Sequence, residues 1–241
     1  MPPGTDRGAP DGRGDLGLGL RHPIERRVQA VLAGHRGDVA AARLALGDPE
    51  PAVRSSALGA LVRLDDLRAE DVDAGLDDPA RQVRARAAEV AAKLGSGAVA
   101  SLVRALGDQD GQVVESACFA LGEVGPRALA TGGRNSSAAA VPALAAVATS
   151  HADPLCREAA VAALGAIGDP AGLSAVLTAT SDKPAVRRRA VLALAPFSGG
   201  DVDAALERAL SDRDWQVRQA AEDLVGRGGP AGDPSGAGQA T

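Results

Sequence analysis

The sequence predicts an all-α protein, a superhelix of about seven α-helix pairs. Three observations predict this fold: an Asp…Val-Arg pattern recurs along the chain, an apolar stripe with helical spacing follows each copy, and glycines separate the stripes. Hydrophobic residues make up 45% of the 241 residues but aromatic residues only 1%. A core of Ala, Leu and Val favours closely packed helices over a pocket for a large flat cofactor.

The repeat is anchored by a valine, or once by Cys156, at positions 53, 83, 113, 156, 186 and 217. Successive spacings are 30, 30, 43, 30 and 31 residues. A fixed spacing in this range is the sequence signature of a repeat architecture. The one long spacing predicts an insertion of 13 residues in the third repeat, as a polar loop at about 126–138.

Each anchor begins an amphipathic helix. Mostly apolar residues follow it at offsets of 4, 8 and 11, which lie on one stripe of a helix. The Asp before the anchor is an N-cap signal, and Gly95, Gly125 and Gly168 mark helix ends. Shorter second helices are expected near 69–76, 98–106, 139–148, 171–180 and 201–210, and a degenerate first pair at 24–33 and 38–46 fits a capping unit.

The repeat array is expected to span 23–227, between tails at 1–22 and 228–241 that hold few apolar residues and are predicted to be disordered. No stretch reaches the roughly 18 apolar residues of a membrane span. The N-terminus also lacks the apolar run of a secretory signal. We therefore expect a cytoplasmic protein without a membrane partner.

On these residues, the chain resembles a HEAT-repeat protein, in particular the short bacterial phycobilisome-lyase HEAT-like repeats. The resemblance covers about residues 23–227 and rests on D-x-x-x-x-V-R-x-x-A-x-x-A-L, matched best by Asp48–Leu61 and Asp182–Leu194. It implies a structural ladder of Asp and Arg between neighbouring repeats. The ladder residues would be Asp48, Arg54, Asp78, Arg84, Asp153, Arg157, Asp182, Arg187, Asp212 and Arg218. The third repeat departs from the pattern because Val114 replaces the arginine, although Asp108 remains.

An enzyme is not expected. Deoxyhypusine hydroxylases of the HEAT type bind two irons with paired His-Glu motifs, and lyases of the resembling family attach bilin chromophores. Here His22, His35 and His151 are far apart and none precedes a Glu, so we predict no metal site, no cofactor and no catalytic residue. Cys118 and Cys156 replace small apolar residues and have no activating partner visible in the sequence.

A nucleic-acid-backbone binder is the alternative function. HEAT-like alkylpurine DNA glycosylases grip duplex DNA on a basic concave face, and this chain has arginines grouped at 81, 84 and 86 and at 187–189. The net charge is −5, however, and the second helices carry acidic residues. In a HEAT superhelix those helices line the concave side, where acid repels phosphate.

Protein binding is the function we expect, by a non-catalytic scaffold or regulatory adaptor. Residues 139–150 and 171–181 contain no charged residue. As second helices they would form an uncharged concave middle, suited to a partner protein or peptide with a basic rim. The candidate contact residues are Leu144, Val147, Ser174, Leu177, Thr178, Arg134 and Asn135. The alternative explanation is that both helices simply bury more of their surface.

Overall fold

The computed structural model describes residues 22–131 and 136–228 and confirms the all-α superhelix. Within this part of the chain there are thirteen α-helices, which form six pairs followed by the single helix α13. They are α1 (Pro23–Arg36), α2 (Val39–Ala45), α3 (Pro51–Arg63), α4 (Ala69–Leu76), α5 (Arg81–Ala91), α6 (Val99–Ala105), α7 (Gly111–Thr131), α8 (Ser136–Ser150), α9 (Pro154–Ile167), α10 (Leu173–Ala179), α11 (Pro184–Ala193), α12 (Gly200–Leu210) and α13 (Trp215–Gly228). Short 3₁₀ segments, Ala92–Ala98 and Pro170–Gly172, precede α6 and α10.

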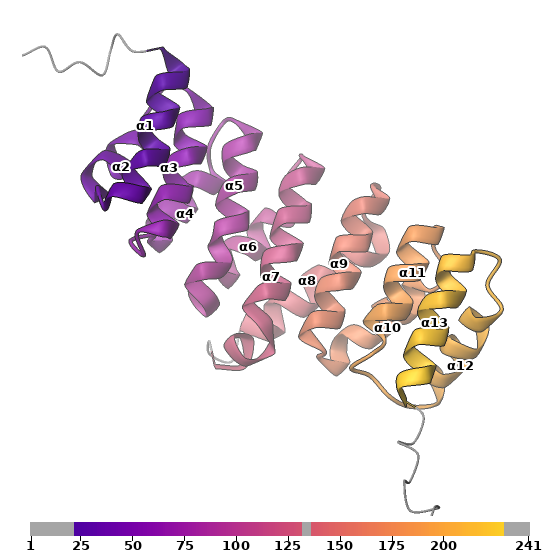
Figure 1. Cartoon of the computed structure of the whole chain (residues 1–241). Helices are drawn as coiled ribbons and strands as arrows, with labels where there is room; N and C mark the ends of the chain where they lie inside the picture. Colours follow the sequence, from indigo (N-terminus) through magenta and orange to yellow (C-terminus); the bar gives the residue numbers. More distant parts are fainter. Residues whose placement is uncertain (1–21, 132–135, 229–241) are drawn as a thin grey trace, which may run out of the picture.

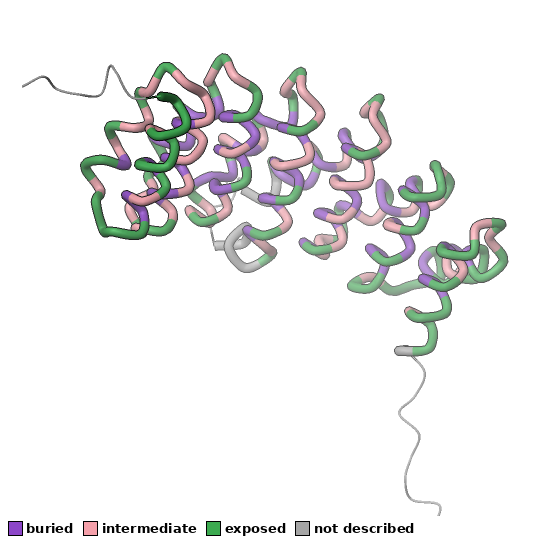
Figure 2. Tube along the Cα trace, turned by 45° about the horizontal axis from the view of Figure 1, so that its top comes forward, coloured by how far each residue is buried: buried purple, intermediate pink, exposed green. Residues whose placement is uncertain are grey.

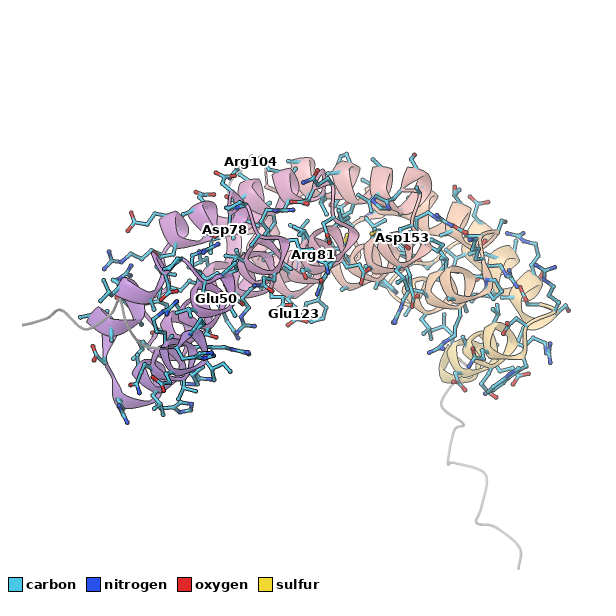
Figure 3. All side chains as sticks on the ribbon, turned by 90° about the horizontal axis from the view of Figure 1, so that it is seen from above. Glu50, Asp78, Arg81, Arg104, Glu123 and Asp153 are labelled. Atoms are coloured by element: carbon cyan, nitrogen blue, oxygen red, sulfur yellow. The ribbon has the colours of Figure 1, made fainter. Side chains whose placement is uncertain are left out.

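The helices form two layers. The six helices that follow the anchors (α3, α5, α7, α9, α11 and α13) and the first helix α1, here the inner helices, lie side by side in one layer, and α2, α4, α6, α8, α10 and α12 (the outer helices) lie behind them (Figure 1). Seen from above, the array is an arch with Arg104 of α6 on its outer side and Glu123 of α7 on its inner side (Figure 3). The expectation that second helices line the concave side is therefore wrong; the Val-Arg helices line it.

Small residues explain why the arch bends toward the inner helices. A Cβ added to Gly165 of α9 would lie 2.7 Å from the Cα of Ala193 of α11, and one added to Gly122 of α7 would lie 3.3 Å from the Cα of Ala163. Such contacts let neighbouring inner helices approach closely. Because each repeat rotates slightly on its neighbour, a closer inner layer curves the whole array toward that side.

The core runs between the two layers along the array. Figure 2 shows buried residues concentrated where the layers meet and exposed residues at turns and helix ends. The largest fully buried side chains are leucines and valines from successive repeats, among them Leu58, Leu102, Leu121, Leu164 and Leu194. No repeat could bury its apolar stripe alone, so the stacking of neighbours supplies the core.

The turns before the inner helices differ in one respect from the N-cap prediction. Asp48 accepts a hydrogen bond from the backbone N–H of Glu50 at 2.8 Å, and Asp78 accepts one from Ala80 at 2.8 Å. Each of these carboxylates closes a turn two residues before the N-cap position, which Glu50 and Ala80 occupy. At α9, by contrast, Asp153 is itself the N-cap. Of the predicted helix ends, only Gly168 caps a helix, α9, whereas Gly95 lies within the 3₁₀ segment Ala92–Ala98 and Gly125 at a kink inside α7. All three have positive φ angles, of 66°, 57° and 71°, which glycine adopts without steric cost.

Candidate functional site

The predicted contact residues of α8 and α10 lie in the outer layer. Leu144 has an exposed fraction of 0% and Val147 of 8%, so both belong to the core and cannot contact a partner. Leu177 is half-buried against the same core, whereas Ser174 and Thr178 are exposed. The uncharged stretch on α8 is therefore explained by burial, the alternative left open by the sequence. Arg134 and Asn135 lie outside the described residues.

The insertion predicted as a loop at 126–138 contains helix on both sides. The chain bends at Gly125, whose φ of 71° and ψ of 169° are not helical, and then continues as a helix to Thr131. Helix α8 begins at Ser136. The described part of the predicted loop is therefore helical on both sides, and residues 132–135 lie outside the described residues.

The predicted ladder residues join neighbouring repeats. Arg54 donates to both carboxylate oxygens of Asp78 at 2.7 Å, and a third nitrogen donates to the carbonyl of Asp48 at 2.8 Å. The same arrangement joins Arg84 to Asp108, Arg157 to Asp182 and Arg187 to Asp212. We call the contact between two neighbouring inner helices a seam. At the first seam, between α1 and α3, Arg26 of α1 forms the ion pair with Asp48 at 2.8 Å. Arg218, at the end of the array, donates to the carbonyl of Asp212 at 2.7 Å.

The seam between α7 and α9 differs from the others because Val114 stands at the arginine position. Asp153 still caps its helix, with Oδ1 accepting from the N–H of Leu155 at 2.9 Å. In the ion pairs of the described chain no guanidinium reaches this carboxylate. Instead, the thiol of Cys156 donates to the carbonyl of Gly111 at 3.4 Å and holds the two helices together.

Acidic groups gather at this seam. Glu115, Asp153 and Cys156 place ligand-type atoms within 4.8 Å of one another. Partial burial, followed by the nearby Asp153 and Glu158, raises the pKa of Glu115 above its ordinary value. The pKa of the Cys156 thiol is raised to about 11, first by burial and then by Asp153 and Glu115. This thiol is protonated at neutral pH, so the group presents two carboxylates and not a thiolate ligand.

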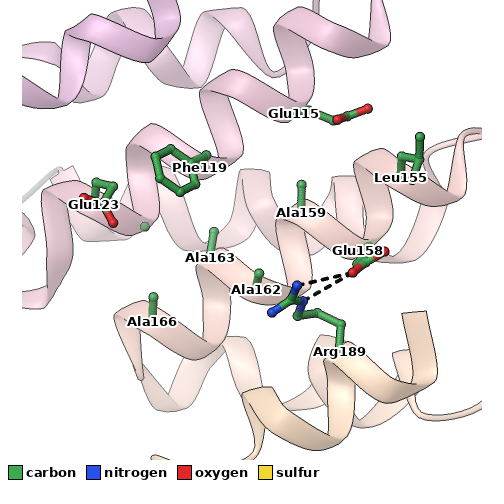
Figure 4. Close-up of a pocket in the computed structure, with 11 residues that line it drawn as sticks. Glu115, Phe119, Glu123, Leu155, Glu158, Ala159, Ala162, Ala163, Ala166 and Arg189 are labelled. Atoms are coloured by element: carbon green, nitrogen blue, oxygen red, sulfur yellow. Dashed lines mark hydrogen bonds and ion pairs between the residues drawn. The ribbon is translucent and has the colours of Figure 1, made fainter. Parts of the chain in front are cut away.

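A groove opens between α7 and α9 on the concave side, with a volume of about 400 Å³. We call it the α7–α9 groove (Figure 4). Its floor consists of small residues, and its rim carries three glutamates and two large apolar side chains. The lining residues are Glu115, Phe119, Gly122, Glu123, Leu155, Glu158, Ala159, Ala162, Ala163, Ala166 and Arg189.

Two apolar side chains of the groove are unusually exposed. The exposed fraction is 65% for Phe119 and 58% for Leu155. The ring of Phe119 lies on the α7 side of the groove, while Arg189 of α11 reaches Glu158 at 3.4 Å on the opposite side (Figure 4). Exposed aromatic rings beside small apolar floors are typical of protein-binding surfaces.

The described chain has a larger cavity, of about 600 Å³, between α1, α2 and α3. Its charged lining includes Arg26 and Asp48, which are paired with each other at 2.8 Å. The two charged groups of this pair therefore balance each other and form part of the structural ladder. The larger cavity also has an exposed apolar side chain, Leu44. The α7–α9 groove is the stronger candidate because it combines an exposed aromatic ring, Phe119, with two carboxylates, Glu115 and Glu123, that form no ion pair with any described residue.

Sequence reasoning missed Glu115, Phe119 and Leu155. A signal for Phe119 existed, because it lies six residues after its anchor and thus outside the buried stripe at offsets 0, 4, 8 and 11. The other repeats have Gly59, Glu89, Ala162, Leu192 and Asp223 at this offset. The approach of Glu115 to Asp153, by contrast, joins two repeats and has no signature within either.

The sequence profile described as HEAT repeats matches residues 127–195 and 141–226. No curated protein sequence matches the chain significantly. Among solved structures, the complex of CpcE and CpcF of phycocyanin lyase from Nostoc sp. PCC7120 matches with a TM-score of 0.52 and 19% identity, over 65% of this chain and 97% of the other. A designed armadillo repeat protein in complex with the peptide (KR)4 matches with a TM-score of 0.55 and 19% identity, over 84% and 97%. At these identities the likeness shows the fold alone.

No helix within 22–131 or 136–228 combines the length and the apolar character needed to cross a membrane.

Proposed function

We propose that this chain, which is a HEAT-repeat protein, is a non-catalytic adaptor that binds another protein or a peptide on its concave face. The observation that carries the proposal is the α7–α9 groove, where Phe119 stands 65% exposed beside a floor of alanines. Leaving such a ring in water is unfavourable, and a partner that covers it gains its burial energy.

The shape of the site favours a protein segment over a small ligand. The groove is open to solvent and its floor consists of glycine and alanine, so a compact ligand would keep much of its surface in water. An extended or helical segment can instead cover the groove and continue along the neighbouring inner helices. The designed armadillo repeat protein, which is in complex with the peptide (KR)4, is an example of a helical array that binds a peptide.

Two observations support a non-catalytic role. Burial raises the pKa of Cys118 to about 12, and that of Cys156 is raised to about 11, so neither thiol is an activated nucleophile. His22 and His35 are exposed, and His151 accepts from the N–H of Asp153 at 3.1 Å, which makes it part of a turn. The groove's charged side chains thus lack an adjacent nucleophile–base pair.

Nucleic-acid binding is the second candidate, because several arginines belong to inner helices. Most of these cations are already paired: Arg81 with Asp110 at 3.3 Å, Arg86 with Glu89 at 2.9 Å and Arg189 with Glu158 at 3.4 Å. Phosphate binding requires cations that are available to neutralise the backbone. The carboxylates in the middle of the concave face oppose it further.

A matched pair of variants tests the proposal. Phe119→Arg places a bulky cation in the groove, and Thr178→Arg makes the same change at an exposed position of the outer helix α10. In affinity purification after nuclease treatment, we expect partners retained by the wild type and by Thr178→Arg to be lost with Phe119→Arg. Equal retention by both variants would refute the concave site, and partners that vanish with nuclease would favour the second candidate.

A further inference from the structure

We propose that the α7–α9 groove recognises a peptide segment in which an Arg or Lys lies close to an apolar residue, with the cation bound between Glu115 and Asp153. The partner's cation thus takes the role that the ladder arginine has at the other seams. This inference rests on the proposed function and specifies the chemistry of the partner.

The ladder itself shows what Asp153 lacks. At the next seam, Asp182 receives Arg157 through two hydrogen bonds of 2.6 and 2.8 Å, one on each carboxylate oxygen. Asp153 occupies the equivalent turn, but only its Oδ1 has a hydrogen-bond partner among the described atoms, the N–H of Leu155. Its Oδ2 lies on the side of Gly111, where a Cβ would be 3.4 Å away. Asp153 does not line the groove but lies two residues before Leu155, which does, and it is only half-buried. A guanidinium or ammonium group from outside the chain can therefore approach this carboxylate.

Glu115 provides the second carboxylate. It lines the groove, and one of its oxygens lies within 4.8 Å of a carboxylate oxygen of Asp153. Two like charges this close repel each other, and a cation placed between them converts the repulsion into attraction. Glu158 is the third acid nearby, but Arg189 already balances it at 3.4 Å. Arg157 interacts electrostatically with Asp153, but its hydrogen bonds go to Asp182 and to the carbonyls of His151 and Ala152. Among the described residues, no guanidinium is therefore hydrogen-bonded to Glu115 or Asp153.

The apolar contact lies next to the acidic one. Leu155 immediately follows the helix start that Asp153 caps, and Phe119 lies one helical turn after Glu115 on α7. A ligand cation bound to the two carboxylates is thus only a few residues from the exposed ring and the alanine floor. The combination favours a segment with both side-chain types over a purely polycationic one, and it excludes the phosphate backbone by charge.

The experiment measures the affinity of defined peptides by fluorescence anisotropy with the full chain. The probes are fluorescein-labelled Gly/Ser peptides with one Arg and one Leu at varied separations. In control peptides Gln replaces the Arg or Ser replaces the Leu. The protein variants are Glu115→Gln and Asp153→Asn, since Asn keeps the N-cap oxygen. The matched control is Glu222→Gln, an exposed acid of α13 with the same charge change.

We expect at least one Arg/Leu peptide to bind, and Glu115→Gln and Asp153→Asn each to weaken it about tenfold, a factor that corresponds to about 1.4 kcal/mol. Glu222→Gln should have no such effect. The affinity of the Gln control peptide should be the same for the wild type and for both variants. The comparison is a double-mutant cycle, which isolates the interaction between the peptide's Arg and each carboxylate. Phe119→Ala should weaken the binding of the Leu-containing peptide and leave the binding of its Ser control unchanged.

Three results would overturn the inference: no peptide of the set binds, the groove variants behave like Glu222→Gln, or the Gln peptide binds as well as the Arg peptide. The first of these leaves the adaptor function standing if Phe119→Arg still abolishes partner retention. Circular dichroism of each variant shows that it is folded before its affinity is interpreted.

Discussion

Arg187 and Arg188 are neighbours in the sequence with opposite surroundings. Arg187 is buried and donates to Asp212 at 2.8 and 2.9 Å and to the carbonyl of Asp182 at 2.8 Å, while Arg188 is exposed. Arg187→Ala should lower the free energy of unfolding by about 2–4 kcal/mol, because it strands a partly buried carboxylate. Arg188→Ala should change it by less than about 0.5 kcal/mol. Chemical denaturation checks both values, and equal losses would contradict the ladder assignment.

Glu115, unlike Arg187, should lower the free energy of unfolding of the wild-type protein at neutral pH. Its pKa is raised by partial burial first and by Asp153 and Glu158 next. The folded state therefore binds its proton more tightly, and stability is lost as the pH rises from the unfolded pKa, near 4.3, through the raised folded value. Glu115→Gln should stabilise the protein by up to about 1 kcal/mol at neutral pH, since the group is partly exposed.

At about pH 3 this gain should disappear, because Glu115 is then protonated in both states. Urea denaturation of Glu115→Gln and of the control Glu222→Gln at both pH values measures the difference. A variant that is less stable at neutral pH would show that Glu115 has a stabilising partner. A gain in stability together with a loss of peptide affinity would mark Glu115 as a residue retained for binding.

At the scale of the elements, the inner helices owe their spacing to glycines. Gly165 of α9 faces the backbone of Ala193 of α11, and a Cβ there would lie 2.7 Å from it. Gly226 of α13 has no atom within 4 Å of the corresponding position. Gly→Ala inside a helix is otherwise favourable by about 0.5–1 kcal/mol.

We therefore expect Gly226→Ala to raise the unfolding free energy slightly and Gly165→Ala to lower it by about 1–3 kcal/mol through overpacking. Thermal denaturation measures both. Small-angle scattering of Gly165→Ala should also show a straighter array, because the inner layer is forced apart. Stabilisation by both substitutions would mean that the close inner spacing does not cause the curvature.

The elements also show what the sequence predicts well. The stripe at offsets 0, 4, 8 and 11 identifies the buried face of the inner helices from α3 to α11, although Val225 at offset 8 of α13 is exposed. The positive φ angles of Gly95, Gly125 and Gly168 follow from conformational preference, but only Gly168 ends a helix, α9. Which layer is concave does not follow from either, because curvature depends on distances between repeats. The uncharged residues Leu144 and Val147 were misplaced for this reason: periodicity shows that α8 is apolar but not what covers it.

The α7–α9 groove could not be predicted from the sequence either, because it too depends on distances between repeats. The sequence does show that Val114 interrupts the ladder. It does not show that the unpaired Asp153 comes within 4.8 Å of Glu115 from another repeat. Sites between stacked repeats depend on their packing, and the repeat pattern fixes only each repeat's own faces.

For the whole molecule, the ladder links stability to pH. The pKa values of Asp48, Asp182 and Asp212 are lowered chiefly by hydrogen bonds from their arginines. In Asp78 and Asp108 burial acts in the raising direction, but Arg54, Arg84 and backbone N–H groups outweigh it and the pKa is again lowered. These five carboxylates contribute stability that is present above the unfolded pKa, near 3.9, and is lost as the pH falls through the lowered values.

We therefore expect the urea midpoint to be nearly constant from neutral pH to about pH 5 and to fall steeply below about pH 4. Circular dichroism across a pH series of urea titrations measures this. A midpoint that is unchanged down to about pH 3 would contradict the stabilising role of the ladder.

The last inner helix closes the array in a different way. Five residues after the anchor, the preceding repeats have the buried residues Leu58, Ala88, Cys118, Val161 and Val191, but α13 has the exposed Glu222. A charged residue on the outer face of the last repeat prevents further stacking, as in the capping repeats of other solenoids.

The central claim is that a partner occupies the concave face at the α7–α9 groove. Site-specific photo-crosslinking tests it most directly, with the photoreactive residue placed at Ala162 in the groove or at Thr178 on the outer helix α10. We predict that the same partner is cross-linked from position 162 and not from position 178, and that Phe119→Arg abolishes the cross-link. A partner cross-linked from position 178 but not from 162 would contradict the account.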